Sequence, residues 1–159
     1  MKLFFKIMTL CTLLMGALAC NKQEEEVELP LEVNYVHLHG TWKLAEMDGS
    51  ETPEGVYCYL VLDREEHTFK MYDNLSSMYA RLNTGHFELV NDVHKGDKIS
   101  GKYDYSRGEW KDEFMITELM PSGSMIWTGV AHPDHVQKFI RCESVPEEIV
   151  KEARQEGKE

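Results

Sequence analysis

From Gly40 onward the sequence is built of short segments in which apolar and polar residues alternate, and turn residues separate these segments about every eight to twelve positions. The clearest segment is Lys98–Tyr105, where Ile99, Tyr103 and Tyr105 fall on one face and polar or charged side chains fall on the other. Period-two alternation is the pattern of a half-buried β-strand. The same pattern predicts strands at Thr41–Met47, Val56–Leu62, Thr68–Tyr72, His86–Val90, Phe114–Leu119, Ser124–Val130 and Val136–Cys142.

These eight predicted strands limit the possible architectures. Most connections have turn chemistry, such as Asp48-Gly49 and Pro121-Ser122-Gly123, and they are too short for the crossovers of about a dozen or more residues that parallel strands need. The strands are therefore expected to be antiparallel and in up-and-down order. A long sheet hides its edges most simply by closing on itself. We predict an all-β fold, an eight-stranded antiparallel up-and-down barrel over residues 36–145, whose interior is either filled or holds one small ligand.

Two segments depart from the strand pattern. Four apolar residues between Leu75 and Leu82 have helical spacing, whereas Met78, Ala80 and Leu82 could also line one face of a strand, so the segment fits either a lid helix or an extra strand. Residues 146–159 begin with a proline and two glutamates, which is typical of a helix start. We predict a short C-terminal helix there, followed by a tail too polar to pack.

The first 19 residues are expected to be a targeting signal rather than part of the fold. Lys2 and Lys6 precede a 13-residue apolar stretch, which is shorter than the about 20 residues of a membrane-spanning helix. The stretch ends in GALAC, which resembles the bacterial lipobox, with Ala17 where leucine is usual. We expect residues 1–19 to be a lipoprotein signal peptide and acylated Cys20 to anchor the protein in a membrane. The alternative is a plain secretory signal cleaved after Ala19.

Residues 20–35 are rich in glutamate and are expected to form an acidic tether. The run Gln23–Glu26 is similar to the surface-export signal of Bacteroidetes lipoproteins, so we expect a cell-envelope lipoprotein of the outer membrane that faces either outward or inward. The whole chain has 17 Lys and Arg against 28 Asp and Glu, a net charge of −11, and the loss of Lys2 and Lys6 leaves −13. This charge disfavours nucleic-acid binding, because phosphates require a basic surface.

Three residues in or next to the first and last strands of the predicted barrel carry a resemblance to a known fold. Gly40-Thr41-Trp42 resembles the Gly-x-Trp signature of lipocalins and related calycins, and Arg141 lies in the last strand, where those families place an arginine. The resemblance implies that Gly40, Trp42 and Arg141 close one end of the barrel, with the guanidinium packed on the indole by cation–π attraction.

Two further stretches, Ser100–Trp110 and the VPEEI sequence that begins at Val145, resemble the lipocalin-like domains of Bacteroidetes lipoproteins, most of which have unknown function. The resemblance covers about residues 36–150 of the chain. Because the matching residues are structural in that family, the resemblance implies a fold rather than an activity.

Aromatic side chains on the predicted strands could line a cavity as well as fill a core. Ligand pockets combine apolar walls with a few polar tips, so we expect Tyr57, Tyr103, Trp110 and Trp127 to line the open end of the barrel. The main hypothesis is a non-catalytic binding protein for a small apolar or amphipathic ligand. A filled barrel would instead serve as a protein-interaction or structural module of a surface complex. An envelope hydrolase is a third alternative, although the chain has no nucleophile-elbow, phosphate-loop, zinc-protease or dinucleotide motif.

Histidines and cysteines complete the search for chemistry. Two histidine pairs have short spacings, but neither has further ligands at a spacing typical of a metal site, so we expect no metal and no other cofactor. These pairs are His37 with His39 and His132 with His135. After removal of the signal and acylation of Cys20, Cys58 and Cys142 remain. They are expected either to stay as buried thiols or to form a disulfide, which an exported protein permits.

Overall fold

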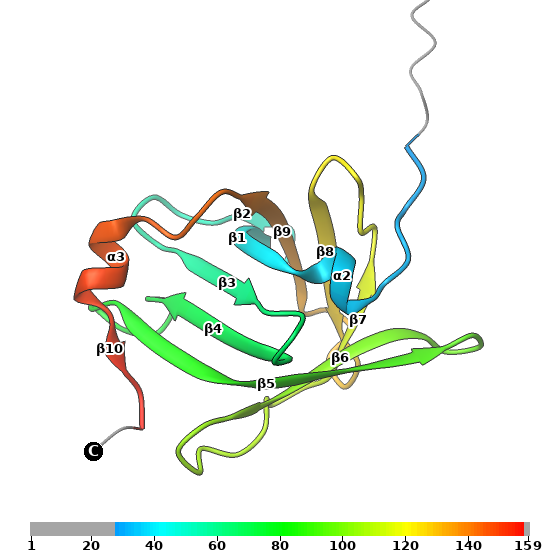
Figure 1. Ribbon diagram of the computed structural model, residues 1–159. Coiled ribbons are helices and arrows are strands. Elements are labelled where there is room, and N and C mark those ends of the chain that lie inside the picture. The colour runs from blue at the N-terminus through cyan, green and yellow to red at the C-terminus, as the bar shows by residue number, and fades with distance from the viewer. Residues whose placement is uncertain (1–27, 158–159) are drawn as a thin grey trace, which may run out of the picture.

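The computed structural model describes residues 28–157, and Figure 1 shows how the elements are arranged. The eight long strands of the barrel are β1 (Gly40–Met47), β3 (Cys58–Leu62), β4 (Thr68–Asp73), β5 (Arg81–Asp92), β6 (Gly96–Tyr103), β7 (Phe114–Thr117), β8 (Ser124–Gly129) and β9 (Val136–Cys142). Two short strands, β2 (Ser50–Glu51) and β10 (Arg154–Gln155), and two short helices, α2 (Tyr35–Leu38) and α3 (Glu147–Glu152), complete the described part of the chain.

The long strands form a closed sheet. Each one pairs antiparallel with the next along the chain, from β1 with β3 to β8 with β9. The sheet closes because β9 also pairs antiparallel with β1, which places Trp42 of β1 between Leu60 of β3 and Arg141 of β9. The prediction of an all-β, eight-stranded up-and-down barrel with a short C-terminal helix is confirmed. All these pairings lie within residues 40–142, so a fragment of residues 21–159 contains every strand that the barrel needs.

The strand β5 is much longer than the predicted strand His86–Val90, since it runs from Arg81 to Asp92. The segment before it is neither a lid helix nor an extra strand. The Ser77 hydroxyl donates to the Tyr79 carbonyl and accepts from the Tyr79 amide, at 2.9 and 3.0 Å, and such local side-chain bonds compete with a helix. Met78 is fully exposed, so the helical spacing of apolar residues here buries no common face.

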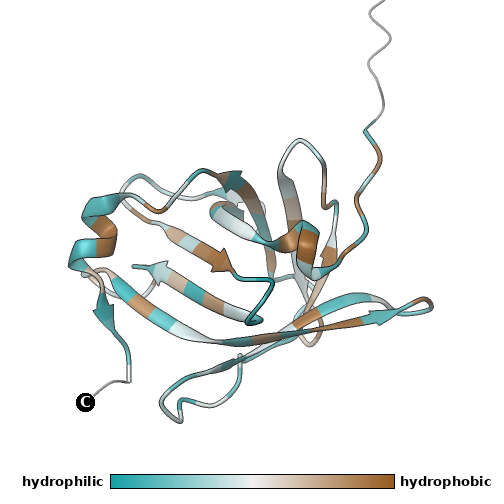
Figure 2. Cartoon of the chain, in the orientation of Figure 1, coloured by the Kyte–Doolittle hydropathy of each residue, from teal (hydrophilic) through white to brown (hydrophobic). Residues whose placement is uncertain are grey.

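The core fills the half of the barrel around Trp42. Figure 2 shows the alternation of apolar and polar residues along the strands. The buried apolar residues of several strands form one core cluster. The largest fully buried side chains are Trp42, Trp127, Phe69, Phe87 and Phe139. Smaller fully buried residues, among them Leu38, Leu44, Leu60, Leu62, Ile99, Leu119 and Met125, occupy the space between them. This half of the interior is therefore filled by side chains.

The N-terminal segment packs under the filled half of the barrel. The sequence assigns residues 20–35 to a tether, but the amide of Leu31 donates to the carbonyl of Leu119 at 2.7 Å and Val33 is only 5 % exposed. The Tyr35 ring stacks on His67 with centroids 3.8 Å apart. Apolar residues at alternate positions 31, 33 and 35 explain this contact, because they can face the barrel together. The packed part of the protein therefore begins before residue 36, and residues 20–27 lie outside the described residues.

The C-terminal segment follows the outer surface of the barrel. Figure 1 shows α3 at the side of the barrel formed by β3, β4 and β5. The tail beyond α3 does pack, contrary to what its polar composition suggests: Arg154 and Glu156 donate backbone hydrogen bonds of 2.9 Å to Ala80 and Leu82, so that β10 runs parallel to β5. Backbone pairing of this kind does not depend on apolar side chains, which is why composition did not reveal it.

Candidate functional site

One end of the barrel is closed by Trp42 and Arg141. The indole of Trp42 is fully buried, and its Nε1–H donates to the Leu38 carbonyl at 2.9 Å. The guanidinium carbon of Arg141 lies 4.2 Å from the centroid of the Trp42 ring, while Nη1 and Nη2 donate to the carbonyls of His39 and His37, each at 2.7 Å. Arg141 thus ties β9 to the chain segment just before β1. Burial lowers the pKa of this guanidinium below its ordinary value, but it stays charged at neutral pH.

Gly40 makes this contact possible. Its φ of +131° belongs to a backbone conformation that side chains disfavour, and a Cβ at this position would overlap the Arg141 guanidinium. The structure therefore brings Gly40, Trp42 and Arg141, the three residues of the resemblance, to the same end of the barrel.

The opposite end, the mouth of the barrel, contains a cleft of about 700 Å³. We call it the mouth cleft. Its walls come from the inner face of the sheet and from the β4–β5, β6–β7 and β8–β9 connections. The residues that line it are Met71, Asp73, Leu75, Ser76, Arg81, Asn83, Tyr103, Arg107, Glu109, Trp110, Lys111, Asp112, Phe114, Trp127, His132, His135 and Gln137.

Three of the four residues predicted to contact a ligand, Tyr103, Trp110 and Trp127, line the mouth cleft. The fourth, Tyr57, does not. Its amide donates to Asn74 Oδ1 at 2.8 Å, and its ring lies 6.0 Å from that of Tyr59, whose side chain faces outward because the alternate residues Cys58 and Leu60 face inward. Tyr57 is thus placed on the outside of the barrel.

Trp110 reaches the cleft because the chain after β6 folds back on that strand. The Trp110 amide donates to the Gly101 carbonyl at 2.8 Å, and the Tyr103 amide donates to the Gly108 carbonyl at 2.8 Å. A Cβ on Gly101 would overlap the Trp110 indole, so the glycine lets the ring lie directly on β6. The indole is 5.1 Å from Phe69 and 5.7 Å from Trp127, between ring centroids. Trp110 and Trp127, together with Phe114, form the floor of the mouth cleft, and Phe69 packs beneath it.

A polar network that the sequence analysis did not identify forms another wall. Asp73, only 1 % exposed, accepts hydrogen bonds from the Arg81 guanidinium and from Asn83 Nδ2, the latter at 3.0 Å. Asn83 in turn accepts through Oδ1 from Arg107, whose guanidinium carbon lies 5.2 Å from the centroid of the Tyr103 ring. The sequence does contain a signal for this network, because Arg81 and Asn83 lie at alternate positions with Phe87 and therefore face inward with it. The signal can be recognised only if the strand is known to begin at Arg81.

Charge and burial perturb several groups of this wall. Burial acts to lower the pKa of Arg81, but its hydrogen bond to Asp73 and the negative charge of Asp73 outweigh burial and raise this pKa. Burial also raises the pKa of the Tyr103 hydroxyl, and the positive charge of Arg107 opposes the rise. Both groups therefore keep their protons at neutral pH. Three buried donors on residues that line the cleft, Arg81 Nε, Trp110 Nε1 and Trp127 Nε1, have no hydrogen-bond acceptor within the described residues.

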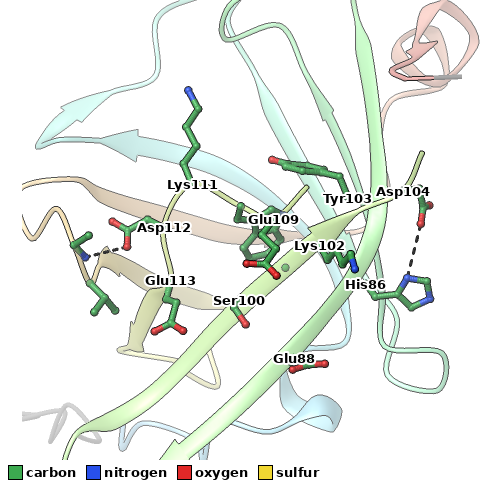
Figure 3. A pocket seen from close by; sticks show the side chains of 14 residues that line it. His86, Glu88, Ser100, Lys102, Tyr103, Asp104, Glu109, Lys111, Asp112 and Glu113 are labelled. Atoms are coloured by element: carbon green, nitrogen blue, oxygen red, sulfur yellow. Dashed lines mark hydrogen bonds and ion pairs between the residues drawn. The ribbon is translucent and has the colours of Figure 1, made fainter. Parts of the chain in front are cut away.

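A second hollow of about 760 Å³ lies on the outer surface, across the β6–β7 connection from the mouth cleft. Figure 3 shows its side chains, which come from β5, β6 and the segment that leads to β7. Charged groups dominate it, as with His86, whose Nδ1 lies 3.8 Å from Asp104 Oδ1. Asp112 accepts from the amides of Ala131 and His132, at 2.9 and 3.1 Å, and these bonds lower its pKa. The two hollows share Tyr103, Glu109, Trp110, Lys111 and Asp112, but only the mouth cleft also contains Phe114 and Trp127.

Three of the histidines in the two sequence pairs, His37, His132 and His135, lie within hydrogen-bond distance of nearby polar groups. His132 Nδ1 lies 3.1 Å from Asp112 Oδ2, His135 lies between Asp48 and Gln137 at 3.0 and 2.9 Å, and His37 Nδ1 is 2.8 Å from the Glu32 carbonyl. Within residues 28–157, no three His, Cys, Asp or Glu side chains converge to hold a metal ion.

The two cysteines lie at opposite ends of the barrel. Cys58 pairs with Asp73 near the mouth and is buried, whereas Cys142 pairs with Thr41 at the closed end. Both are free thiols, and the structure places them too far apart in the sheet for a disulfide. Burial raises the pKa of each thiol, most strongly that of Cys58.

Comparison with known proteins adds no family to this picture. No protein-family model, curated protein or solved structure matches the chain. The geometry of the barrel itself is therefore the basis for a functional assignment. Neither of the helices in residues 28–157 has the length and apolar character to span a bilayer.

Proposed function

We propose that this protein is a membrane-anchored, lipocalin-like binding protein of the bacterial envelope, which holds one small apolar or amphipathic ligand in the mouth cleft and does not catalyse a reaction. One observation carries the proposal: the barrel is closed and filled at the Trp42 end but hollow at the other, where Tyr103, Trp110 and Trp127 line a cleft of about 700 Å³.

The cleft has the size and chemistry of a small-molecule site. Such sites usually occupy about 300–1,000 Å³, with apolar and aromatic walls and a few well-placed polar groups. Here Trp110, Trp127 and Phe114 supply aromatic surface, and their ring centroids lie 5.5 to 6.3 Å apart. The Asp73 network supplies the polar groups on one side. A ligand with an apolar body and a polar end would match both walls.

The position of the N-terminal segment supports the anchoring part of the proposal. Leu31 and Val33 pack at the closed end of the barrel, so the chain enters the fold on the side away from the mouth. An anchor at Cys20, which lies outside the described residues, would then be connected to the closed end by a short stretch of chain. The mouth cleft would face away from the membrane and be open to ligands from the aqueous side.

The non-catalytic part of the proposal is supported by the state of Cys58, a buried thiol beside the polar wall of the mouth cleft. Cys58 on β3 is paired directly with Asp73 on β4, and burial raises the pKa of its thiol. A reactive cysteine needs the opposite shift, because the thiolate is the nucleophile. Cys58 therefore suits a packing role.

Binding of a neutral fluorescent probe tests the proposal. Phenylnaphthylamine fluoresces strongly only in apolar surroundings, and we expect it to bind the fragment of residues 21–159 with one site per molecule. Gln137→Trp, which introduces a large ring into the lining, should weaken binding about tenfold because a wrongly shaped wall costs about 1–3 kcal/mol. Lys138→Trp, at the next position of β9 and on the opposite face, is the matched control and should bind as the parent does.

The alternative, a protein-interaction or structural module, is favoured by the filled half of the interior. The same titration separates the two. A fragment that folds but shows no increase in probe fluorescence, or one in which Lys138→Trp weakens binding as much as Gln137→Trp does, would contradict ligand binding in the mouth and leave the interaction module as the better account.

A further inference from the structure

We infer that the ligand of the mouth cleft is an amphipathic anion, whose apolar body contacts the aromatic floor and whose negatively charged group is recognised by Arg107. This inference rests on the proposed function, since it specifies the chemistry of the ligand for the same cleft.

The first step concerns the charges of the polar wall. Asp73 and Arg81 neutralise each other, because the carboxylate accepts directly from the guanidinium. Arg107 is different: the partners that hold it are neutral, namely Asn83 Oδ1 and the face of the Tyr103 ring. Within residues 28–157, no carboxylate lies in ion-pair distance of Arg107. Arg107 therefore has no direct ion-pair partner among the described side chains, although the acids Glu109 and Asp112 line the cleft together with Lys111.

The second step concerns hydrogen-bond donors. Trp127 is 2 % exposed, and its Nε1 is among the three buried donors without an acceptor, together with Trp110 Nε1 and Arg81 Nε. A buried donor without a partner costs about 1–3 kcal/mol, and such atoms are rare in folded proteins. All three atoms belong to residues that line the mouth cleft, and all three are N–H donors. These donors lie beneath the lining rather than in the open cleft, so a ligand meets the exposed guanidinium of Arg107 first and could pair with them only if the rings shift.

The third step concerns the rest of the molecule. The chain is strongly acidic, with a net charge of −11, so an anion is not attracted by the protein as a whole. A positive group at the edge of an aromatic cleft is therefore a local feature. Hydrogen bonds between a guanidinium and an anion are stronger than those between neutral groups, and a carboxylate, sulfonate or phosphate could accept them. The amphipathic character follows from the floor formed by Trp110, Trp127 and Phe114.

A matched pair of probes isolates the charge. Anilinonaphthalene sulfonate and phenylnaphthylamine share one aromatic skeleton, but only the first carries an anionic group. We expect the fragment of residues 21–159 to bind the sulfonate about tenfold more tightly than the neutral probe, as one charge-assisted hydrogen bond would give. In Arg107→Gln this ratio of affinities should fall to about one, and Arg107→Lys should recover part of it. Arg64→Gln, which removes an exposed arginine outside the cleft, should keep the parent ratio.

The outcomes are distinguishable. Binding of neither probe contradicts the proposed function and with it this inference. Equal binding of both probes, or a ratio that Arg107→Gln leaves unchanged, overturns the inference while ligand binding in the mouth stands. Competition against the bound sulfonate by naphthoate and by naphthyl phosphate then separates the two sources of negative charge: displacement by the carboxylate alone indicates a carboxylic acid ligand, and displacement by the phosphate alone indicates a phosphate ester.

Discussion

The guanidinium of Arg141 on β9 lies 4.2 Å from the ring of Trp42 on β1, and the two residues are paired directly across the seam where the sheet closes. Arg141 is the last-strand residue that also binds the carbonyls of His37 and His39, before β1 begins. The closure of the barrel therefore depends on a contact between its two ends in sequence.

Replacing Arg141 should weaken the closed end without affecting the mouth. Arg141→Met removes the cation–π contact and two hydrogen bonds, and we expect the free energy of unfolding to fall by about 2 kcal/mol. Urea denaturation of the fragment of residues 21–159 measures this change. Arg64→Met, at an exposed turn, serves as the control and should change stability by less than about 0.5 kcal/mol. An Arg141→Met variant as stable as the parent would show that the seam does not depend on this residue.

Gly101 should be intolerant of even one methyl group. The added Cβ of Gly101→Ala meets the Trp110 indole, so either the ring moves out of the mouth cleft or the strand shifts. We expect a loss of about 1–3 kcal/mol in the free energy of unfolding, typical of overpacking, together with a shift of the tryptophan emission to longer wavelength. Ser100→Ala, the neighbouring position on the outer face, should leave both unchanged. Unaltered emission in Gly101→Ala would mean that Trp110 does not lie on β6.

Buried Cys58 should make stability depend on alkaline pH. Burial raises the pKa of this thiol above its ordinary value of 9.0, so above pH 9.0 the unfolded chain loses a proton that the folded protein retains. The free energy of unfolding should therefore be independent of this group below that pH and fall above it, by about 1.4 kcal/mol per pH unit.

Comparison of the parent with Cys58→Ala between about pH 8 and pH 11 isolates this contribution. The difference in the free energy of unfolding between the parent and Cys58→Ala should become smaller as the pH rises. Cys142→Ala, whose thiol is only partly buried, should show a weaker dependence. A constant difference between the parent and Cys58→Ala across the range would mean that the Cys58 thiol titrates alike in both states.

Cys20 should determine where the full chain resides. In cells that acylate lipoproteins, Cys20→Ala should lose labelling by a fatty-acid analogue and move from the membrane fraction to the soluble one, because acyl chains supply about 0.8 kcal/mol per buried methylene. Fractionation and labelling of the full chain measure both. Membrane association that survives the substitution would contradict the lipoprotein hypothesis.

Much of the fold could be predicted because alternation is a direct consequence of strand geometry. It located the segments around Trp42, Ile99 and Trp127, and the short turns required the antiparallel order. Alternation failed at β3 and the residue before it, because Tyr57, Tyr59 and Val61 are about as apolar as Cys58, Leu60 and Leu62. The sequence could not show which set faces inward, and this is why Tyr57 is expected at the open end although it does not line the mouth cleft.

The polar wall of the mouth cleft was missed for a different reason. Asp73, Arg81 and Asn83 meet only through the β4–β5 pairing, which begins within a segment whose apolar residues have helical spacing. Polar residues on the inward face of a strand are informative, but the face must be known first. Arg107 joins the network through a turn in which Tyr105 and Ser106 both have positive φ. Glycine is the usual sequence signal for such a turn, and neither position is a glycine.

The central claim is that the mouth of the barrel holds a ligand, and a crystal structure of residues 21–159 grown with anilinonaphthalene sulfonate tests it most directly. We predict density for one probe in the mouth cleft, with its rings on Trp110 and Trp127 and its sulfonate within hydrogen-bond distance of Arg107. Density only in the outer hollow of Figure 3, or a mouth cleft that side chains fill, would contradict the account.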